Sequence, residues 1–184
     1  MKKKLLLLLS LIPTLYLSGQ EVTTNKQGQN EIKINTISLI AMGAIDISYE
    51  RILNEESSFG ISAYIKSNDD FNESDISRTF SLTPYYRVHF SKGYNKGFFI
   101  EGFAVYYKGE EFIYENYNYD YNYSSNYTIQ DYDGLALGVG IGGKWVTKRG
   151  FVAEISLGIG RNISGGPQDV PVVGRGGITL GKRF

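Results

Sequence analysis

The sequence contains no cysteine, a single histidine (His89) and only four prolines. The absence of cysteine excludes a disulfide scaffold, a thiolate metal site, a cysteine nucleophile and a cysteine-linked lipid anchor. One histidine is too few for a histidine-rich metal centre, so we expect neither a metal ion nor another cofactor. Positive charge is not in excess either, because 19 basic residues face 19 acidic residues in a chain of 184. The chain therefore offers no electrostatic basis for binding nucleic acid.

Glycine (22), tyrosine (15) and phenylalanine (10) are abundant instead. The length is that of one ordinary domain. The mean hydropathy of −0.21 excludes a helical membrane protein. It does not exclude a membrane-spanning β-barrel, whose strands alternate apolar and polar residues. The pattern along the chain has to separate a soluble protein from such a barrel.

The first twenty residues have the layout of an export signal. Three lysines after Met1 precede an apolar stretch that reaches about Leu17, and Ser18-Gly19 follows. The apolar stretch is too short to span a bilayer, which takes about 20 residues. We predict a cleaved signal peptide over 1–19, with an uncleaved anchor as the alternative. Residues 20–30 are polar and aperiodic, which predicts a disordered leader before a domain at 31–184.

Alternation of apolar and polar residues recurs along the rest of the chain. It is clearest in Arg78 to Phe90, and it returns in Leu135 to Val146 and Phe151 to Gly160, where glycines and charges make up the polar face. This period of two predicts β-strands long enough to cross a bilayer at a tilt. We expect eight strands, at about 31–41, 44–53, 59–67, 78–90, 98–108, 134–146, 151–161 and 173–184. In the first strand the apolar phase slips between Ile34 and Ile37, which predicts a bulge or burial on both faces.

The lengths of the connections give a second signal. Gaps after the even-numbered strands are short, whereas the gaps after the third, fifth and seventh strands are longer, and the longest runs from about Gly109 to Asp133. Short turns that alternate with long loops are typical of an outer-membrane β-barrel, with the turns in the periplasm and the loops outside the cell. Both termini then lie in the periplasm. The first connection, near Met42-Gly43, is too short for this rule.

A soluble β-sandwich or a soluble periplasmic ligand-binding barrel also alternates, but its apolar face points inward. Its water-facing side favours charged and hydroxyl groups, whereas the polar face here is rich in glycine, as at Gly138, Gly140 and Gly142. Glycine weakens a solvated strand, yet it fits the narrow lumen of an eight-stranded barrel, where small residues oppose large ones. Aromatic residues near strand ends are predicted to form interfacial girdles: Phe59, Phe90, Phe98, Tyr107, Trp145 and Phe151. We therefore predict an all-β fold, an eight-stranded antiparallel up-and-down transmembrane β-barrel surrounded by outer-membrane lipid.

The final stretch, GGITLGKRF, ends on Phe184. Together with the export signal and the eight amphipathic strands, it resembles the small outer-membrane β-barrel proteins of Gram-negative bacteria, OmpA- and OmpX-like in size. The stretches NEIKIN, IDISYERIL, LTPYYRVHF and KGYNKGFF resemble more specifically an outer-membrane barrel family of unknown function common in Bacteroidetes. This resemblance implies that the strand ending in Phe184 is read by the barrel-assembly machinery. Lys182 departs from the aromatic or apolar residue usual at its position.

Counting outward from two short turns places Arg87 opposite Glu101 and Lys144 opposite Glu154. All four side chains have the lumen-facing parity, and Glu50 lies at the same level of its own strand. With a rise of about 3.3 Å per residue, less the tilt, this predicts a layer of opposite charges within ~10 Å of the periplasmic rim. Charges removed from water have to pair. The layer is either a polar plug that closes the barrel to ions or a set of salt bridges that only specifies the register.

The segment His89-Phe90-Ser91 has the His-x-Ser spacing of outer-membrane lipid A deacylases, in which a histidine activates a serine hydroxyl. Its position argues against that chemistry, because the fourth strand runs toward the periplasm while lipid A fills the outer leaflet. We expect a histidine of the interior or rim and no enzymatic activity. An outer-membrane lipid A acyl hydrolase that uses His89 and Ser91 is the alternative.

The longest loop contains a tyrosine tract in which every second residue from Tyr117 to Tyr123 is tyrosine. An extended arm would place Tyr117, Tyr119, Tyr121 and Tyr123 on one face. Tyrosine with asparagine and serine is the composition of adaptable recognition surfaces. The tract is expected either to bind an extracellular glycan or protein or to pack on other loops without binding. The whole sequence predicts an outer-membrane protein with a structural or surface-binding role, and not a wide pore.

Overall fold

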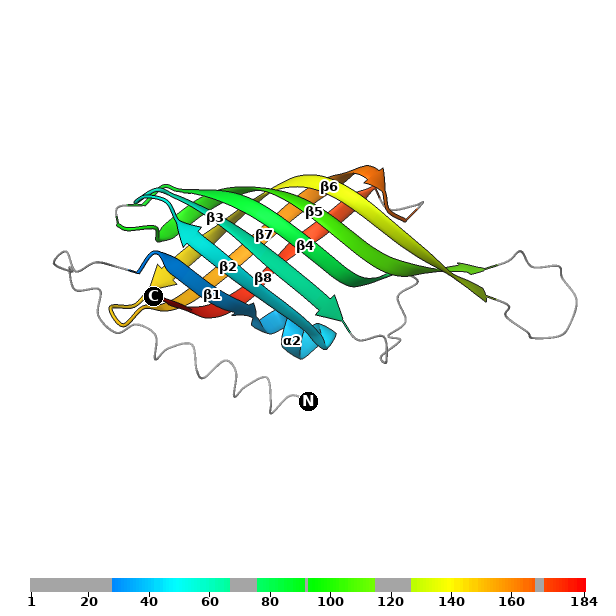
Figure 1. Cartoon of the computed structure of the whole chain (residues 1–184), viewed down its shortest axis with the longest axis horizontal. Helices are drawn as coiled ribbons and strands as arrows, with labels where there is room; N and C mark the ends of the chain where they lie inside the picture. The colour runs from blue at the N-terminus through cyan, green and yellow to red at the C-terminus, as the bar shows by residue number, and fades with distance from the viewer. Residues whose placement is uncertain (1–27, 67–75, 92, 115–126, 168–170) are drawn as a thin grey trace, which may run out of the picture.

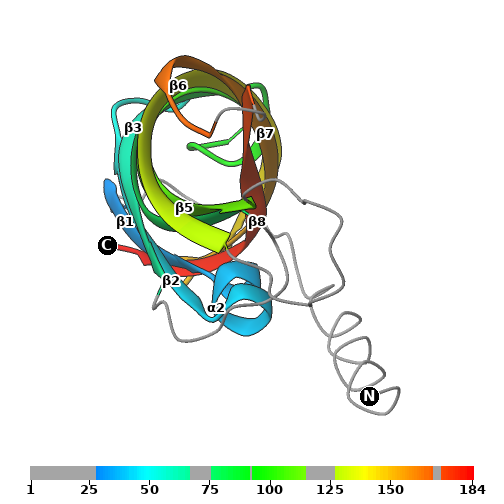
Figure 2. The same cartoon turned by 90° about the vertical axis from the view of Figure 1, so that its right-hand side faces the viewer.

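The computed structural model describes residues 28–66, 76–91, 93–114, 127–167 and 171–184. Within them, antiparallel strands close into a barrel in which β1 to β8 pair in sequence order and β8 returns to β1 (Figure 1, Figure 2). The elements are β1 Asn30–Asn35, α2 Thr36–Met42, β2 Ala44–Ile52, β3 Ser57–Lys66, β4 Ile76–His89, β5 Gly97–Tyr114, β6 Tyr127–Val146, β7 Phe151–Gly165 and β8 Val172–Arg183. The predicted fold class and strand order are confirmed. The predicted signal peptide and most of the predicted leader lie outside the described residues.

The two ends of the barrel differ. The three short connections, β2–β3, β4–β5 and β6–β7, lie at one end together with the C-terminus, and we call this the turn end (Figure 1). The opposite end is the loop end. At the turn end, Phe184 and Asn30 exchange two backbone hydrogen bonds of 2.9 and 3.0 Å, which tie the last strand to the first.

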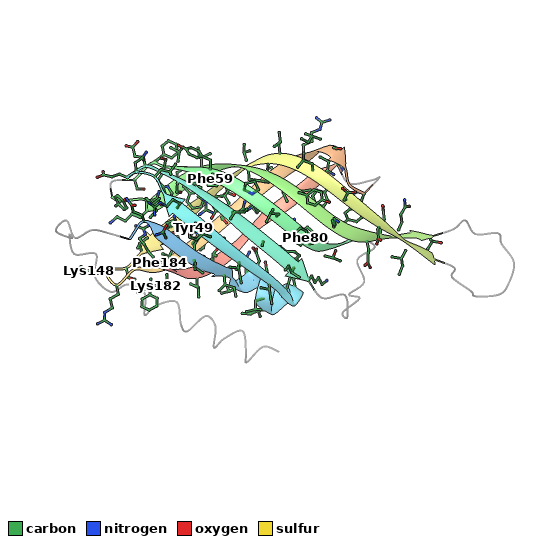
Figure 3. All side chains as sticks on the ribbon, in the orientation of Figure 1. Tyr49, Phe59, Phe80, Lys148, Lys182 and Phe184 are labelled. Atoms are coloured by element: carbon green, nitrogen blue, oxygen red, sulfur yellow. The ribbon has the colours of Figure 1, made fainter. Side chains whose placement is uncertain are left out.

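The barrel wall has an apolar outer face and a polar inner face. On β6, the outward Leu137, Val139 and Ile141 are 52%, 64% and 53% exposed, whereas the intervening Ala136 and Lys144 are buried. This facing pattern is the reverse of what a soluble ligand-binding barrel needs. Several aromatic side chains are exposed on the outer face near the turn end: Phe59, Phe90, Phe98, Trp145 and Phe151. Figure 3 shows Tyr49, Phe59 and Phe184 toward the same end.

Tyr107 does not belong to this girdle. Its ring is buried in the lumen, and its hydroxyl donates to Asn162 Oδ1 at 2.6 Å. The prediction was wrong because it considered nearness to a strand end without parity. Tyr107 shares its face with Phe103 and Glu101, both buried.

Glycine makes room for these inward rings, as the sequence predicts for a narrow barrel. A Cβ atom added to Gly60 would overlap the ring of Tyr85, and one added to Gly142 would overlap the ring of Phe99. Tyr85, Phe103, Val105, Tyr107, Ala136 and Val173 form an apolar cluster inside the barrel. The lumen is thus filled by side chains along much of its length.

The first predicted strand is half wrong. The strand β1 ends at Asn35, and residues Thr36–Met42 form the helix α2 instead of continuing to residue 41. The Asn35 side chain accepts hydrogen bonds from the N–H groups of Ile37 and Ser38, which starts the helix. Gly43 ends it in the left-handed region at φ 63°. The slip of the apolar phase therefore marks a change from strand to helix, and the helix supplies the connection that looked too short.

The strands β5 and β6 are longer than predicted and extend beyond the barrel as a two-stranded arm (Figure 1). Their register continues to Tyr114↔Tyr127, whereas the described register of β4 on β5 ends at Ile76↔Glu111 and that of β7 on β6 at Gly134↔Gly165. Apolar and polar residues do not alternate in the arm, because beyond the barrel neither face of a strand lines the lumen. The alternation therefore did not predict these parts of β5 and β6.

Candidate functional site

Eight charged side chains are buried in the lumen toward the turn end, each no more than 5% exposed. We call them the lumen charge cluster: Glu31 and Lys33 from β1, Glu50 from β2, Arg87 from β4, Glu101 from β5, Lys144 from β6, Glu154 from β7 and Arg183 from β8. Alternation on each strand turns these residues inward, and the closed barrel brings them together. The four carboxylates and four cations balance in charge.

Both predicted cross-strand pairs lie in the predicted register. Arg87 is opposite Glu101 and Lys144 is opposite Glu154. The guanidinium Nε of Arg87 donates to Glu101 at 2.8 Å, and the Lys144 ammonium lies 3.4 Å from Glu154. Opposite charges that face one another on neighbouring strands stabilise that register.

Glu50, the fifth predicted member, is one of three carboxylates of the cluster that each contact three cations; the other two are Glu31 and Glu154. It is fully buried and contacts three cations: Lys33, Lys144 at 2.5 Å and Arg87 at 2.9 Å. The hydroxyl of Tyr85 donates to the same carboxylate at 3.2 Å. Glu50 therefore joins side chains from strands that are not neighbours in the wall.

Three members were not predicted, namely Glu31, Lys33 and Arg183. Lys33 on β1 reaches over β8 and donates to Glu154 on β7 at 2.7 Å, while Arg183 pairs with Glu31 at 2.5 Å across the β8–β1 seam. The alternation in NEIKIN already places Glu31 and Lys33 on one face. Their partners were missed because no turn joins β1 to β7 or β8, so counting from a turn reaches none of these pairs.

The connection between β4 and β5 closes the mouth of the barrel at the turn end. Asn95 is fully buried there, has a positive φ of 47°, and accepts a hydrogen bond from Lys144 at 2.9 Å. The backbone carbonyls of Tyr94 and Asn95 accept from Arg183 at 3.0 and 2.8 Å. Figure 2, viewed from the loop end, shows the green segment between β4 and β5 inside the outline of the barrel.

Aromatic rings also pack against the charged side chains. The Arg87 guanidinium lies 4.4 Å from the centre of the Tyr85 ring and 4.3 Å from that of Phe99. Arg175 lies 4.6 Å from the Tyr85 ring and 3.4 Å from Glu101, between the charge cluster and the apolar cluster. Cation–π contacts of this kind are strongest where water is excluded. In this part of the lumen, charged and aromatic side chains are therefore in direct contact with each other.

Oxygens of Glu31, Glu50 and Glu154 lie within 4.8 Å of one another, a spacing suited to a cation. Two ammonium groups already occupy that role, because Lys33 and Lys144 each contact all three carboxylates. The chemistry of this donor set is therefore that of a compensated ion-pair network.

His89 and Ser91 both line a pocket of about 530 Å³ at the turn end, together with Glu55, Glu56 and Phe90 among others. The described contacts do not join them as base and nucleophile. Nδ1 of His89 lies 3.2 Å from the Asn95 amide, and the Ser91 hydroxyl accepts from the Phe98 N–H at 3.2 Å. Nε2 of His89 is buried without a hydrogen-bond partner among the described residues.

Two further predicted sites belong to other parts of the chain. The tyrosine tract Tyr117, Tyr119, Tyr121 and Tyr123 lies outside the described residues, between β5 and β6 in the sequence. Phe184 is exposed on the outer face at the turn end. Beside it, Lys182 donates to the backbone carbonyl of Arg149 and lies 4.6 Å from the Phe151 ring.

A closed eight-stranded barrel with an apolar outer wall and a lumen of charges, rings and glycines has the architecture of a small outer-membrane β-barrel protein. By family, the chain belongs to the group described as "Protein of unknown function (DUF3575)", whose model matches residues 5–164.

Among solved structures, the chain is similar to the N-terminal β-barrel domain of Pseudomonas aeruginosa OprF. The TM-score is 0.52 at 14% sequence identity, over 86% of this chain and 100% of that one. This likeness concerns the fold. No curated protein matches the chain. Among the described residues, no helix is long and apolar enough to cross a bilayer.

Proposed function

We propose that the protein is an integral protein of a bacterial outer membrane, without enzymatic activity, that acts at the cell surface through the arm formed by β5 and β6. The observation that carries this proposal is the arm itself, which continues the wall beyond its neighbours to Tyr114↔Tyr127. The predicted recognition tract lies between the two strands of this arm in the sequence, which supports a role for the tract at the loop end. The ligand class is an extracellular glycan or protein.

Two sets of alternate residues in the tract, the tyrosines and the residues between them, can be replaced separately to test this proposal. In one variant Tyr117, Tyr119, Tyr121 and Tyr123 are replaced by serine; in the control, the intervening Asn118, Asp120 and Asn122 are replaced by serine. Cells that display each protein are applied to immobilised polysaccharide and to immobilised protein. We expect the tyrosine variant to lose retention on one of these surfaces and the control to keep it. Equal retention of both variants and the parent would contradict a binding role.

A second role, closure of the barrel to ions, is supported by the lumen charge cluster. Its members come from seven of the eight strands, and the β4–β5 connection covers them at the turn end. We propose that the cluster is a plug that keeps the barrel non-conducting. Narrow barrels of eight strands are filled by side chains in just this way.

Planar-bilayer conductance tests the plug. Arg87→Ala removes the cation shared by Glu50, Glu101 and Glu154. We expect current steps in Arg87→Ala and in Glu101→Ala, and none in the parent. Arg51→Ala is the control, because Arg51 is exposed on the outer face of β2. Closed behaviour of both Arg87→Ala and Glu101→Ala would leave the cluster a purely structural role.

Biogenesis completes the proposal. Export by a cleaved signal peptide and recognition of the β8 strand by the barrel-assembly machinery are supported by the sequence of the first 19 residues and by the terminal Phe184. The exposed position of Phe184, at the end of the strand that closes the barrel on β1, supports a role as an assembly signal.

A further inference from the structure

The barrel wall is interrupted where β1 ends. The strand β1 pairs with β8 only from Glu31↔Arg183 to Asn35↔Thr179, although β8 continues back to Val172. On its other side, the described register of β1 with β2 ends at Ile34↔Ile47. The part of the predicted first strand nearer the loop end is thus replaced by α2. This helix lies against the outside of the wall between β2 and β8 (Figure 2).

Side chains satisfy the strand edge that this replacement leaves open. Asn35 Nδ2 donates to the carbonyl of Gly176 at 3.1 Å, and the Thr36 hydroxyl donates to the carbonyl of Ile178 at 2.8 Å. The helix is capped at both ends by Asn35 and Gly43. Inside a bilayer, backbone polar groups have to find partners within the protein. These two carbonyls of β8 have such partners, as contact of the seam with lipid requires.

Polar contacts of α2 face the barrel. The Ser38 side chain is buried, and its hydroxyl lies 3.4 Å from Asp46, which also accepts from Asn35 at 3.0 Å. The remaining exposed side chains are apolar, with Ile40 76% exposed and Met42 49% exposed, and the segment 36–43 contains no charged residue. A helix of seven residues is far too short to be stable alone in water.

The exposed residues on either side of α2 show how far the apolar outer wall extends along the barrel axis. Directly after the helix, Ile45 points outward at 52% exposure and is paired with the outward Ile65 at 56%. On the other side of the seam, Ile178 and Leu180 are 41% and 49% exposed. The apolar outer wall therefore reaches the level of the helix on both sides, and the helix continues that wall.

From this continuity we infer that α2 is embedded in the outer leaflet and that its exposed face binds the acyl chains of the surrounding lipid. The first connection at the loop end is then a lipid-contacting element of the wall, while the arm of β5 and β6 lies in water. This inference rests on the proposed membrane location. The competing occupants of the face are water and the same face of a second copy.

Tryptophan quenching by lipid distinguishes these occupants. Trp145 is the only tryptophan, so a Trp145→Phe background carries one introduced probe at a time. Ile40→Trp and Met42→Trp report on the helix. Leu157→Trp, at a wall residue that is 73% exposed, is the lipid control, and Ile129→Trp, on the arm, is the water control. Each variant is refolded into phosphatidylcholine vesicles with plain or bromine-substituted acyl chains, and heat-modifiable gel migration verifies folding.

We expect brominated chains to quench the helix probes as strongly as Leu157→Trp and to spare Ile129→Trp. Quenching of the helix probes by aqueous acrylamide alone would overturn the inference in favour of water. Protection from both quenchers would overturn it in favour of a second copy. If Leu157→Trp itself escapes the brominated chains, the proposed membrane location fails, and the result is distinct from a failure at α2. Quenching is measured separately for Ile40→Trp and Met42→Trp, so a single one of these variants that folds is enough to test the inference.

Discussion

At the residue scale, Glu50 illustrates how the lumen charge cluster is held together. One buried carboxylate contacts Lys33, Lys144 and Arg87 and accepts from Tyr85. Burial of charge is costly, and such a network is stable only while each charge keeps its partners. We therefore expect the cluster to specify the closed barrel more than it adds net stability, because a partly paired arrangement of the same strands leaves charges uncompensated.

Removal of the Glu50 charge should reveal this dependence. We expect Glu50→Gln to lower the free energy of unfolding by about 3–5 kcal/mol, the typical cost of breaking a buried ion pair on one side. Urea titration of the protein in lipid vesicles, followed by Trp145 emission, measures it. The control is Glu56→Gln, at an exposed glutamate of the β2–β3 connection. Equal stability of the two variants would contradict the central role of Glu50.

The same residues show what the sequence can predict about the site. Parity and short turns were enough to pair Arg87 with Glu101 and Lys144 with Glu154, because each pair belongs to one hairpin. The contact of Lys33 with Glu154 was not predictable in this way. It passes over β8, and only the closure of the barrel by β8 and β1 brings β1 close to β7.

At the scale of elements, the errors in the predicted fold occur where a strand leaves the shared wall. Most strands were found because each has one apolar and one polar environment, which imposes a period of two. The arm of β5 and β6 lies beyond the register with β4 and β7, so its residues do not separate a lumen from an outer wall and the period of two disappears. At the end of β1, a capping asparagine and a terminal glycine define a helix within an apolar stretch, and periodicity alone did not separate it from a strand.

The capping of α2 leads to a prediction for that element. Asn35→Ala removes the acceptor for the Ile37 and Ser38 N–H groups and the donor to Gly176. We expect faster hydrogen–deuterium exchange of the α2 amides, because the loss of an N-cap typically costs about 1 kcal/mol. Asn54→Ala is the matched control, since Asn54 accepts from two backbone N–H groups in the β2–β3 connection. Unchanged exchange in α2 would refute the capping role of Asn35.

At the scale of the whole molecule, composition hides the architecture. A mean hydropathy of −0.21 is the average of an apolar outer wall, a polar lumen and polar connections. Among the described residues the eight strands pair in a closed order, and at the β8–β1 seam the side chains of Asn35 and Thr36 donate to the carbonyls of Gly176 and Ile178. The exposed apolar outer wall supports the proposed location in a membrane, where lipid covers such a surface.

The most direct test of this account is gel migration of the protein from fractionated cells, with and without boiling. The account predicts that the protein is found in the outer-membrane fraction, and that the unboiled sample migrates as a folded barrel whose band shifts when boiling unfolds it. Recovery of the protein from the soluble periplasmic fraction, with one band that boiling does not move, would contradict the account.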